Sequence, residues 1–115
     1  MQYALLIYQG TFWGAIPNLS ENEKNALVTE YGEINQAPGV TPGLPLGLPE
    51  DATTVHVEDG KALTSDGPYI GTEGAIAGWY VFEADDLDAA IELASRIPAA
   101  RRGGAVEVRP VRVYW

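Results

Sequence analysis

Two short apolar runs constrain the fold of this chain more than any other feature of its sequence. They span Gln2–Tyr8 ("QYALLIY") and Ala75–Ala84 ("AIAGWYVFEA") and place apolar side chains at successive positions. Because successive side chains of a strand point to opposite faces of a sheet, such runs predict strands that are buried on both faces. Any fold for this chain must therefore cover both faces of these two strands.

Each apolar run is followed by the signal of a helix. After the first run and a loop containing Gly10 and Gly14, the sequence Ser20-Glu21-Asn22-Glu23 forms a capping box, which predicts a helix that begins after Ser20 and ends at Pro38-Gly39. After the second run, Asp85 is the predicted N-cap of a helix that Pro98 closes. The predicted apolar faces are Leu27, Val28, Tyr31 and Ile34 in the first helix and Leu87, Ala90, Ile91, Ala94 and Ile97 in the second.

The segment between the helices contains the clearest local signal. Two β-branched runs flank Asp59-Gly60, a pair favoured in two-residue type I′ turns, and predict a β-hairpin over Thr53–Glu58 and Lys61–Ser65. The Pro- and Gly-rich stretch before the hairpin, "APGVTPGLPLGLPEDA", predicts an ordered loop or a short irregular strand that crosses the sheet. The final run, "AVEVRPVRVYW", predicts a strand with a bulge or edge position at Arg109-Pro110.

The order strand, helix, hairpin, strand, helix, strand predicts an α+β fold, a ferredoxin-like sandwich with a possible extra strand, in a single domain over residues 1–115. Two helices can cover only one face of such a sheet. Since the first and fourth strands are apolar on both faces, we expect a second copy to cover the other face and form a homodimer packed sheet to sheet.

Composition excludes several classes of function. The formal net charge is −9, and the seven basic residues do not form one stripe, which disfavours nucleic-acid binding. The chain has no cysteine, and its first apolar run is too short to span a bilayer, so we expect a cytoplasmic protein without membrane contact. With neither a His/Asp/Glu cluster at ligand spacing nor a phosphate-binding Gly-rich loop, we expect neither metal nor cofactor.

Several motifs together resemble the YCII-related family. They are "ATTVHVEDGKALTSDGPY", the helix "DDLDAAIELASRIPAAR" and the strand "AVEVRPV", supported by "YALLIY" and "EYGEI" near the start of the chain. The chain is most similar to the branch named for an Asp-Gly-Pro-Phe motif, although Tyr69 replaces the Phe. The resemblance implies a dimeric α+β barrel. Most members of this branch have no established activity, and some are encoded beside extracytoplasmic-function sigma factors.

The motif Asp66-Gly67-Pro68-Tyr69 has two interpretations. Asp, Gly and Pro are favoured turn residues, so the motif can be a turn alone. Alternatively, Asp66 stands at the mouth of the barrel as a general base or polar anchor, and both interpretations can hold together. His56 is the only histidine and is a second catalytic candidate. Its predicted partner across the hairpin is Leu63, roughly 10 Å along the sheet from Asp66, which predicts no direct hydrogen bond between His56 and Asp66.

Aromatic residues are numerous for so small a domain, and most belong in a core or an interface. Tyr8, Trp13, Tyr31 and Tyr69 are our candidates to line a pocket for a small apolar or aromatic ligand, with Trp13 in its Gly-flanked loop as a mobile wall. We therefore expect a small-molecule-binding protein or an enzyme whose ligand lies between sheet and helices near Asp66. The alternatives are a non-catalytic regulatory or interaction module, linked by the resemblance to a sigma factor, and a purely structural homo-oligomer.

Overall fold

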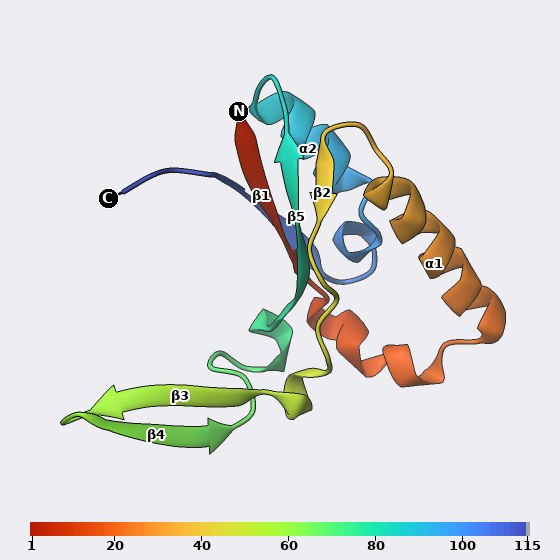
Figure 1. Cartoon of the computed structure of the whole chain (residues 1–115). Coiled ribbons are helices and arrows are strands. Elements are labelled where there is room, and N and C mark those ends of the chain that lie inside the picture. Colours follow the sequence, from red (N-terminus) through yellow and green to blue (C-terminus); the bar gives the residue numbers. More distant parts are fainter. Residues whose placement is uncertain (115) are drawn as a thin grey trace.

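The computed structural model describes residues 1–114 and contains two separate antiparallel sheets (Figure 1). Four strands form one sheet in the order β2-β5-β1-β6, and β3 and β4 form the other. The strands are β1 (Gln2–Tyr8), β2 (Val40–Pro42), β3 (Thr53–Glu58), β4 (Lys61–Asp66), β5 (Ile76–Glu83) and β6 (Ala105–Pro110). The helices are α1 (Glu21–Asn35), α2 (Leu87–Ser95) and the short 3₁₀ helices η1 (Gly10–Gly14), η2 (Ile16–Asn18), η3 (Pro49–Asp51), η4 (Thr72–Gly74) and η5 (Pro98–Arg101).

The four-stranded sheet has the ferredoxin-like arrangement that the sequence predicts. Its two central strands, β1 and β5, are the two apolar runs, and α1 and α2 lie on one side of the sheet (Figure 1). The edge strand next to β5 is β2, the short irregular strand expected in the Pro- and Gly-rich stretch. The predicted hairpin is therefore not part of this sheet but an addition between its second and third strands.

The core lies between the sheet and the helices. Tyr3, Leu5 and Ile7 alternate along β1 and are buried there. They pack in one cluster with Ala90 and Leu93 of α2 and with the other buried residues Ile34, Tyr80, Ala84, Ile97 and Ala99.

The predicted helix faces are only partly correct. Ile34, Ala90, Ala94 and Ile97 are buried, but Val28 is 71% exposed, and Leu87 and Ile91 are each 49% exposed. Leu93, absent from the predicted face, is buried. Periodicity gives the spacing of an apolar face but not its width, and in α2 the rows that carry Leu87 and Ile91 lie outside the buried face.

Both helices begin at the polar residues that their sequences suggest, within one position. The Glu23 N–H donates to the Ser20 hydroxyl at 3.1 Å, and the Ser20 N–H donates to the Glu23 carboxylate at 3.0 Å, which completes the capping box. The N-cap of α2 is Asp86, not the predicted Asp85, and its carboxylate accepts the Ala89 N–H at 2.9 Å. The adjacent acids are equivalent in composition, and the N-cap is the one three residues before the amide it accepts.

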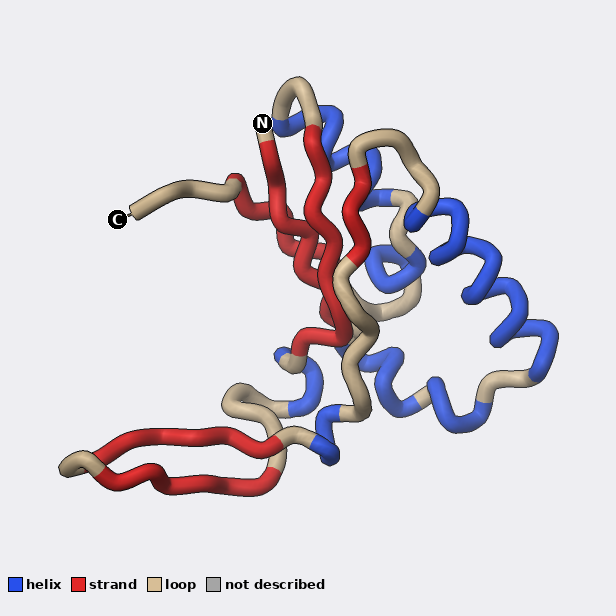
Figure 2. The backbone as a smooth tube through the Cα atoms, viewed as in Figure 1, coloured by secondary structure: helices blue, strands red, loops and turns tan. Residues whose placement is uncertain are grey.

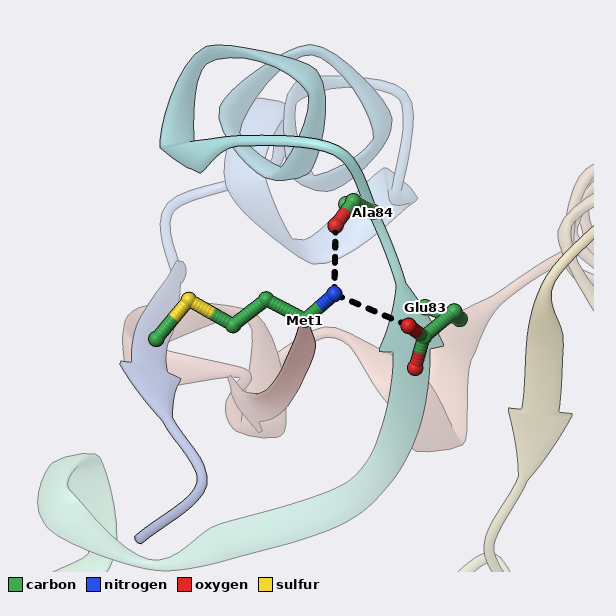
Figure 3. A network of polar contacts seen from close by, with 3 residues as sticks. All are labelled: Met1, Glu83 and Ala84. Carbon is green, nitrogen blue, oxygen red and sulfur yellow. Dashed lines mark hydrogen bonds and ion pairs between the residues drawn. The ribbon is translucent and has the colours of Figure 1, made fainter.

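The first strand is anchored at its start to the end of β5 (Figure 3). The Met1 ammonium donates to the Glu83 carboxylate at 2.8 Å and to the Ala84 carbonyl at 3.0 Å. A charged group with two acceptors in these positions holds β1 in register with β5, where Gln2 lies opposite Glu83.

The last strand ends earlier than predicted. β6 pairs with β1 from Tyr8↔Ala105 to Tyr3↔Pro110 and is an edge strand, as the Arg109-Pro110 pair suggests. Beyond Pro110, the Val111 N–H donates to the Gln2 carbonyl at 2.9 Å, and residues 111–114 form no strand. The last predicted position, Trp115, lies outside the described residues.

The hairpin has the predicted turn and register. Asp59 and Gly60 have φ values of 50° and 77°, the left-handed pair that a type I′ turn requires. The pairs run from Glu58↔Lys61 through His56↔Leu63 to Thr53↔Asp66.

The molecule is more extended than a compact domain of its length. Its radius of gyration is 15.9 Å, against about 13 Å expected for a compact chain of this size. The hairpin causes much of the difference, because it projects away from the four-stranded sheet (Figure 2). Residues 1–114 form no layer on the side of that sheet opposite the helices (Figure 1).

Candidate functional site

The Asp66-Gly67-Pro68-Tyr69 motif lies where the hairpin returns toward the main sheet. Gly67 has a φ of +96°, which explains the glycine at this position. Its N–H donates to the Ala52 carbonyl at 2.8 Å, and its carbonyl accepts the Thr54 hydroxyl at 2.8 Å. These two bonds join the strand entering the hairpin to the motif that leaves it. The turn interpretation of the motif thus has a structural basis in Gly67.

The structure does not bring Asp66 and His56 together. Asp66 lies opposite Thr53 and His56 lies opposite Leu63, so alternation along β3 places the two side chains on opposite faces of the hairpin. Asp66 is exposed. The separation predicted from the hairpin register is therefore reinforced by a difference in face.

His56 instead contacts an aromatic residue of the motif. Its ring centroid lies 5.4 Å from that of Tyr69, with the two rings tilted by 58°. This geometry is typical of an aromatic pair, and it steadies a Tyr69 side chain that is otherwise 75% exposed. The pairing connects a residue in the middle of β3 to one beyond the end of β4, which strand periodicity does not reveal.

A cavity of about 470 Å³ lies between the motif and the end of the main sheet, and we call it the hairpin-base cavity. Tyr8 at the end of β1 and Tyr69 of the motif both line it. Its other walls come from both sides of the hairpin and from the start of β5, namely Leu46, Gly47, Leu48, Pro49, Asp51, Ala52, Pro68, Ile70, Gly74, Ala75 and Ile76. The fold thus unites two of the four aromatic candidates, while Asp66 lies outside the cavity wall.

Sequence reasoning missed two leucines of the cavity wall. Leu46 and Leu48 come from the stretch "LPLGLP", which we interpreted only as a loop or irregular strand. The available signal is the leucine at every second position, which places alternate side chains on one side of an extended chain. The Leu46 N–H donates to the Ala77 carbonyl at 2.9 Å and holds this stretch beside β5. Asp51 is the one carboxylate among the described residues of the wall, and it accepts the Leu48 N–H at 3.3 Å.

Tyr31 lines a second cavity, of about 390 Å³, between α1 and the short helices. Burial raises the pKa of Tyr31, with smaller opposing effects from hydrogen bonds to Gln9 and the Ala99 backbone. On another wall, the Arg102 guanidinium lies 5.9 Å from the centre of the Phe12 ring. The four predicted ligand-binding residues therefore do not share one pocket.

Trp13 lines neither of these two cavities. It lies in η1 and is 9% exposed, and η1 contacts η4. Its indole N–H is buried without a hydrogen-bond partner among residues 1–114. The flanking glycines indicated a loop, but Gly10 with a φ of +58° packs closely against Gly103, which holds this segment to the chain before β6.

Two further site classes find no support in the described part of the chain. Residues 1–114 contain no group of three or more His, Cys, Asp or Glu side chains placed to hold a metal ion. Over the same residues, neither helix has the length and apolar character needed to cross a bilayer.

Comparison with known proteins places the chain in a family context. A family model described as the YCII-related domain matches residues 1–114. A curated protein of Rhizobium meliloti (strain 1021), described as uncharacterized, is 27% identical over 120 residues, which cover 99% of this chain and 94% of that protein.

Proposed function

Because the chain belongs to the YCII-related family, in which the fold is shared but an activity does not follow from it, we propose a function from its site. We propose that the chain binds a small apolar or aromatic molecule in the hairpin-base cavity. The observation that carries this proposal is the convergence of Tyr8 and Tyr69 on one cavity from segments far apart in the sequence. A volume of about 470 Å³ and largely apolar walls suit such a ligand. We assign the chain to the Asp-Gly-Pro-Phe branch of the family on its Asp66–Tyr69 motif, and we place the protein in the cytoplasm.

The two catalytic candidates have supporting roles in this proposal. Asp66 precedes the wall residues Pro68 and Tyr69 and acts as a charged anchor beside the cavity, not as a base within it. His56 is a positioning residue, since its ring packs against Tyr69. Neither arrangement forms a complete catalytic constellation. The function that we propose is therefore ligand binding and not catalysis.

The apolar character of β1 and β5 on both faces supports a homodimer that packs sheet to sheet. The side of β1 away from the helices carries Ala4, Leu6 and Tyr8, all half-buried. Such a face on one side of a sheet is typical of an interaction surface.

A regulatory or interaction module, including one that acts on a sigma factor, is the alternative function. The observation that favours it is the hairpin, whose Val55 and Val57 are exposed. The two functions differ in what they require of the hairpin-base cavity, because only the first needs the cavity to hold a ligand.

Titration with N-phenyl-1-naphthylamine tests the ligand proposal, since this dye is neutral, aromatic and fluorescent in apolar surroundings. We expect saturable binding that Tyr69→Ala weakens about tenfold or more, equivalent to ~1.4 kcal/mol. Ile91→Ala, at a half-exposed apolar side chain on α2, is the matched control and should leave the affinity unchanged. Equal affinity of wild type and Tyr69→Ala would contradict the assignment of the cavity.

The same titration with a cationic aromatic dye tests the role of Asp66. Asp66→Asn keeps the shape of the side chain and removes its charge. We expect this change to lower the affinity for the cationic dye and to leave the affinity for the neutral dye unchanged, because a charged anchor acts through its charge. A parallel loss for both dyes would point to a change in the turn itself.

A further inference from the structure

Two apolar surfaces of the molecule are left uncovered by the chain itself. The first is the side of the four-stranded sheet away from the helices, which we call the open sheet face; on its two central strands it carries Ala4, Leu6, Tyr8, Ile76, Trp79 and Val81. The second is one face of the hairpin. Exposed apolar surfaces of this kind are typical of interaction sites.

The hairpin is amphipathic across its two faces. Its register places Val55 beside Thr64 and Val57 beside Ala62, and we call these four residues the uncharged hairpin face; Asp66, opposite Thr53, lies on the same side at the base of the hairpin. Val55 and Val57 are 58% and 68% exposed. The opposite face carries His56 and the Glu58–Lys61 pair. Since a two-stranded hairpin is marginally stable alone in water, an uncharged face of this kind is typical of one that packs on something else.

The hairpin and the open sheet face border the same space. In Figure 1, the hairpin projects from the lower end of the main sheet toward the side opposite the helices, and the chain after β6 extends toward that side as well. The hairpin-base cavity borders the open sheet face at the end nearest the hairpin, because Tyr8 and Ile76 belong both to that face and to the cavity wall. A body that sits on the open sheet face must therefore also meet the mouth of the cavity.

We propose that the hairpin of each copy in the homodimer lays its uncharged face against the other copy, and that this second copy closes the hairpin-base cavity. The ligand site is then complete only in the dimer. The closing of the cavity rests on the proposed ligand function, whereas the placement of the hairpin does not.

Opposite charges at the border of the open sheet face favour a second copy as the occupant, because a two-fold axis can pair them. A net charge of −9 makes association of two copies costly unless the contact is uncharged, which the two surfaces are at their centres. At the border of the open sheet face, Glu107 and Arg109 lie opposite Leu6 and Ala4, and two-fold symmetry can pair each with its opposite on the partner.

The hairpin adds roughly half as much again to the projected area that the sheet offers a partner. Strand spacings give the sheet roughly 400 Å² of projected area and the hairpin roughly 200 Å². Specific interfaces bury about 800 Å² of accessible surface per partner. The hairpin therefore supplies a substantial share of what association needs, and its loss should be measurable.

Analytical ultracentrifugation of three proteins tests the placement of the hairpin. Wild type should be a dimer at micromolar concentration. Val57→Lys adds a cation to the uncharged hairpin face and should weaken dimerisation about tenfold or more. Leu63→Lys adds the same cation on the opposite face, at a side chain that is 48% exposed, and should leave dimerisation within about threefold of wild type. Val57→Thr, which keeps the strand-forming shape, provides a milder version of the first change.

A monomeric wild type would overturn the proposal and direct attention to a different protein as the partner. Equal dimerisation of wild type and Val57→Lys would overturn the role of the hairpin.

The closing of the cavity is tested by the neutral dye at a concentration where Val57→Lys is monomeric. We expect the monomer to bind the dye about tenfold more weakly than the dimer. Equal binding by the monomer would refute closure and keep the ligand proposal, whereas a dimer that binds no dye would refute the ligand proposal and keep the hairpin contact.

Discussion

The main sheet and the hairpin are both antiparallel, yet they depend on the rest of the molecule in opposite ways. In the main sheet, Leu5 is fully buried and packs with residues of α2. In the hairpin, all residues except Thr54 are exposed, and order comes from local pairing and the Asp59-Gly60 turn. The difference separates two kinds of stability, one from burial across the chain and the other from short-range geometry.

Truncation of a core leucine should give the largest effect and the sharpest contrast between these regions. Leu93 is 2% exposed and packs beneath the sheet. We expect Leu93→Ala to cost about 3 kcal/mol of unfolding free energy, through lost burial and the cavity that remains. Val57→Ala in the hairpin should cost well under about 1 kcal/mol at concentrations where the chain is monomeric. Urea denaturation of both variants measures the contrast, and similar losses would show that the hairpin belongs to the same cooperative unit as the core.

Alkaline pH should weaken the main sheet through Tyr80. Burial raises the pKa of Tyr80 to about 12, with a smaller contribution from Tyr31, from an ordinary value of 10.0. The folded protein thus retains a proton that the unfolded chain releases, and the stability present below pH 10 is lost as the pH rises toward 12. Melting temperatures between pH 8 and 12 should fall less steeply for Tyr80→Phe than for wild type. Parallel curves would mean that the phenol is not shielded as its burial suggests.

A change in the hairpin turn should have the smallest global effect. Gly60 has a φ of 77°, which a β-branched residue resists, so Gly60→Val should destabilise the hairpin by about 1 kcal/mol or more. Because the hairpin is separate from the main sheet, we expect faster amide exchange in β3 and β4 with little change in β1 and β5. Gly14→Val, at a glycine with open space and no positive φ, serves as the matched substitution. Faster exchange throughout β1 and β5 would break the proposed separation.

Local signals predicted local structure well. The capping box at Ser20 and Glu23, the turn at Asp59-Gly60 and the pairing of His56 with Leu63 all depend on residues close in the chain, and the structure contains each of them. The chemistry of these motifs needs no information about the rest of the fold. The two apolar runs likewise identified the central strands of the sheet.

Long-range placement could not be predicted in the same way. The hairpin strands resemble the edge strands β2 and β6 in composition, so composition alone does not show that Val40–Pro42, and not the hairpin, pairs with β5. The candidate site shows the same limit. Tyr8 and Tyr69 meet, but Tyr31 lies at another cavity and Trp13 is buried, because sequence marks a residue as aromatic without saying which wall it belongs to.

The hydrogen bond between Leu46 and Ala77 has a consequence for how such a chain can diversify. It brings together the two ends of the excursion that carries the hairpin, so the segment between them leaves and re-enters the sheet at one place. Changing the length of a segment with adjoining ends costs little free energy, since closure entropy grows only slowly with length. Insertions, deletions or exchanges in this segment would change the ligand or partner that the protein binds, while the four-stranded sheet is kept. Recognition and folding can thus evolve at different rates within one small domain.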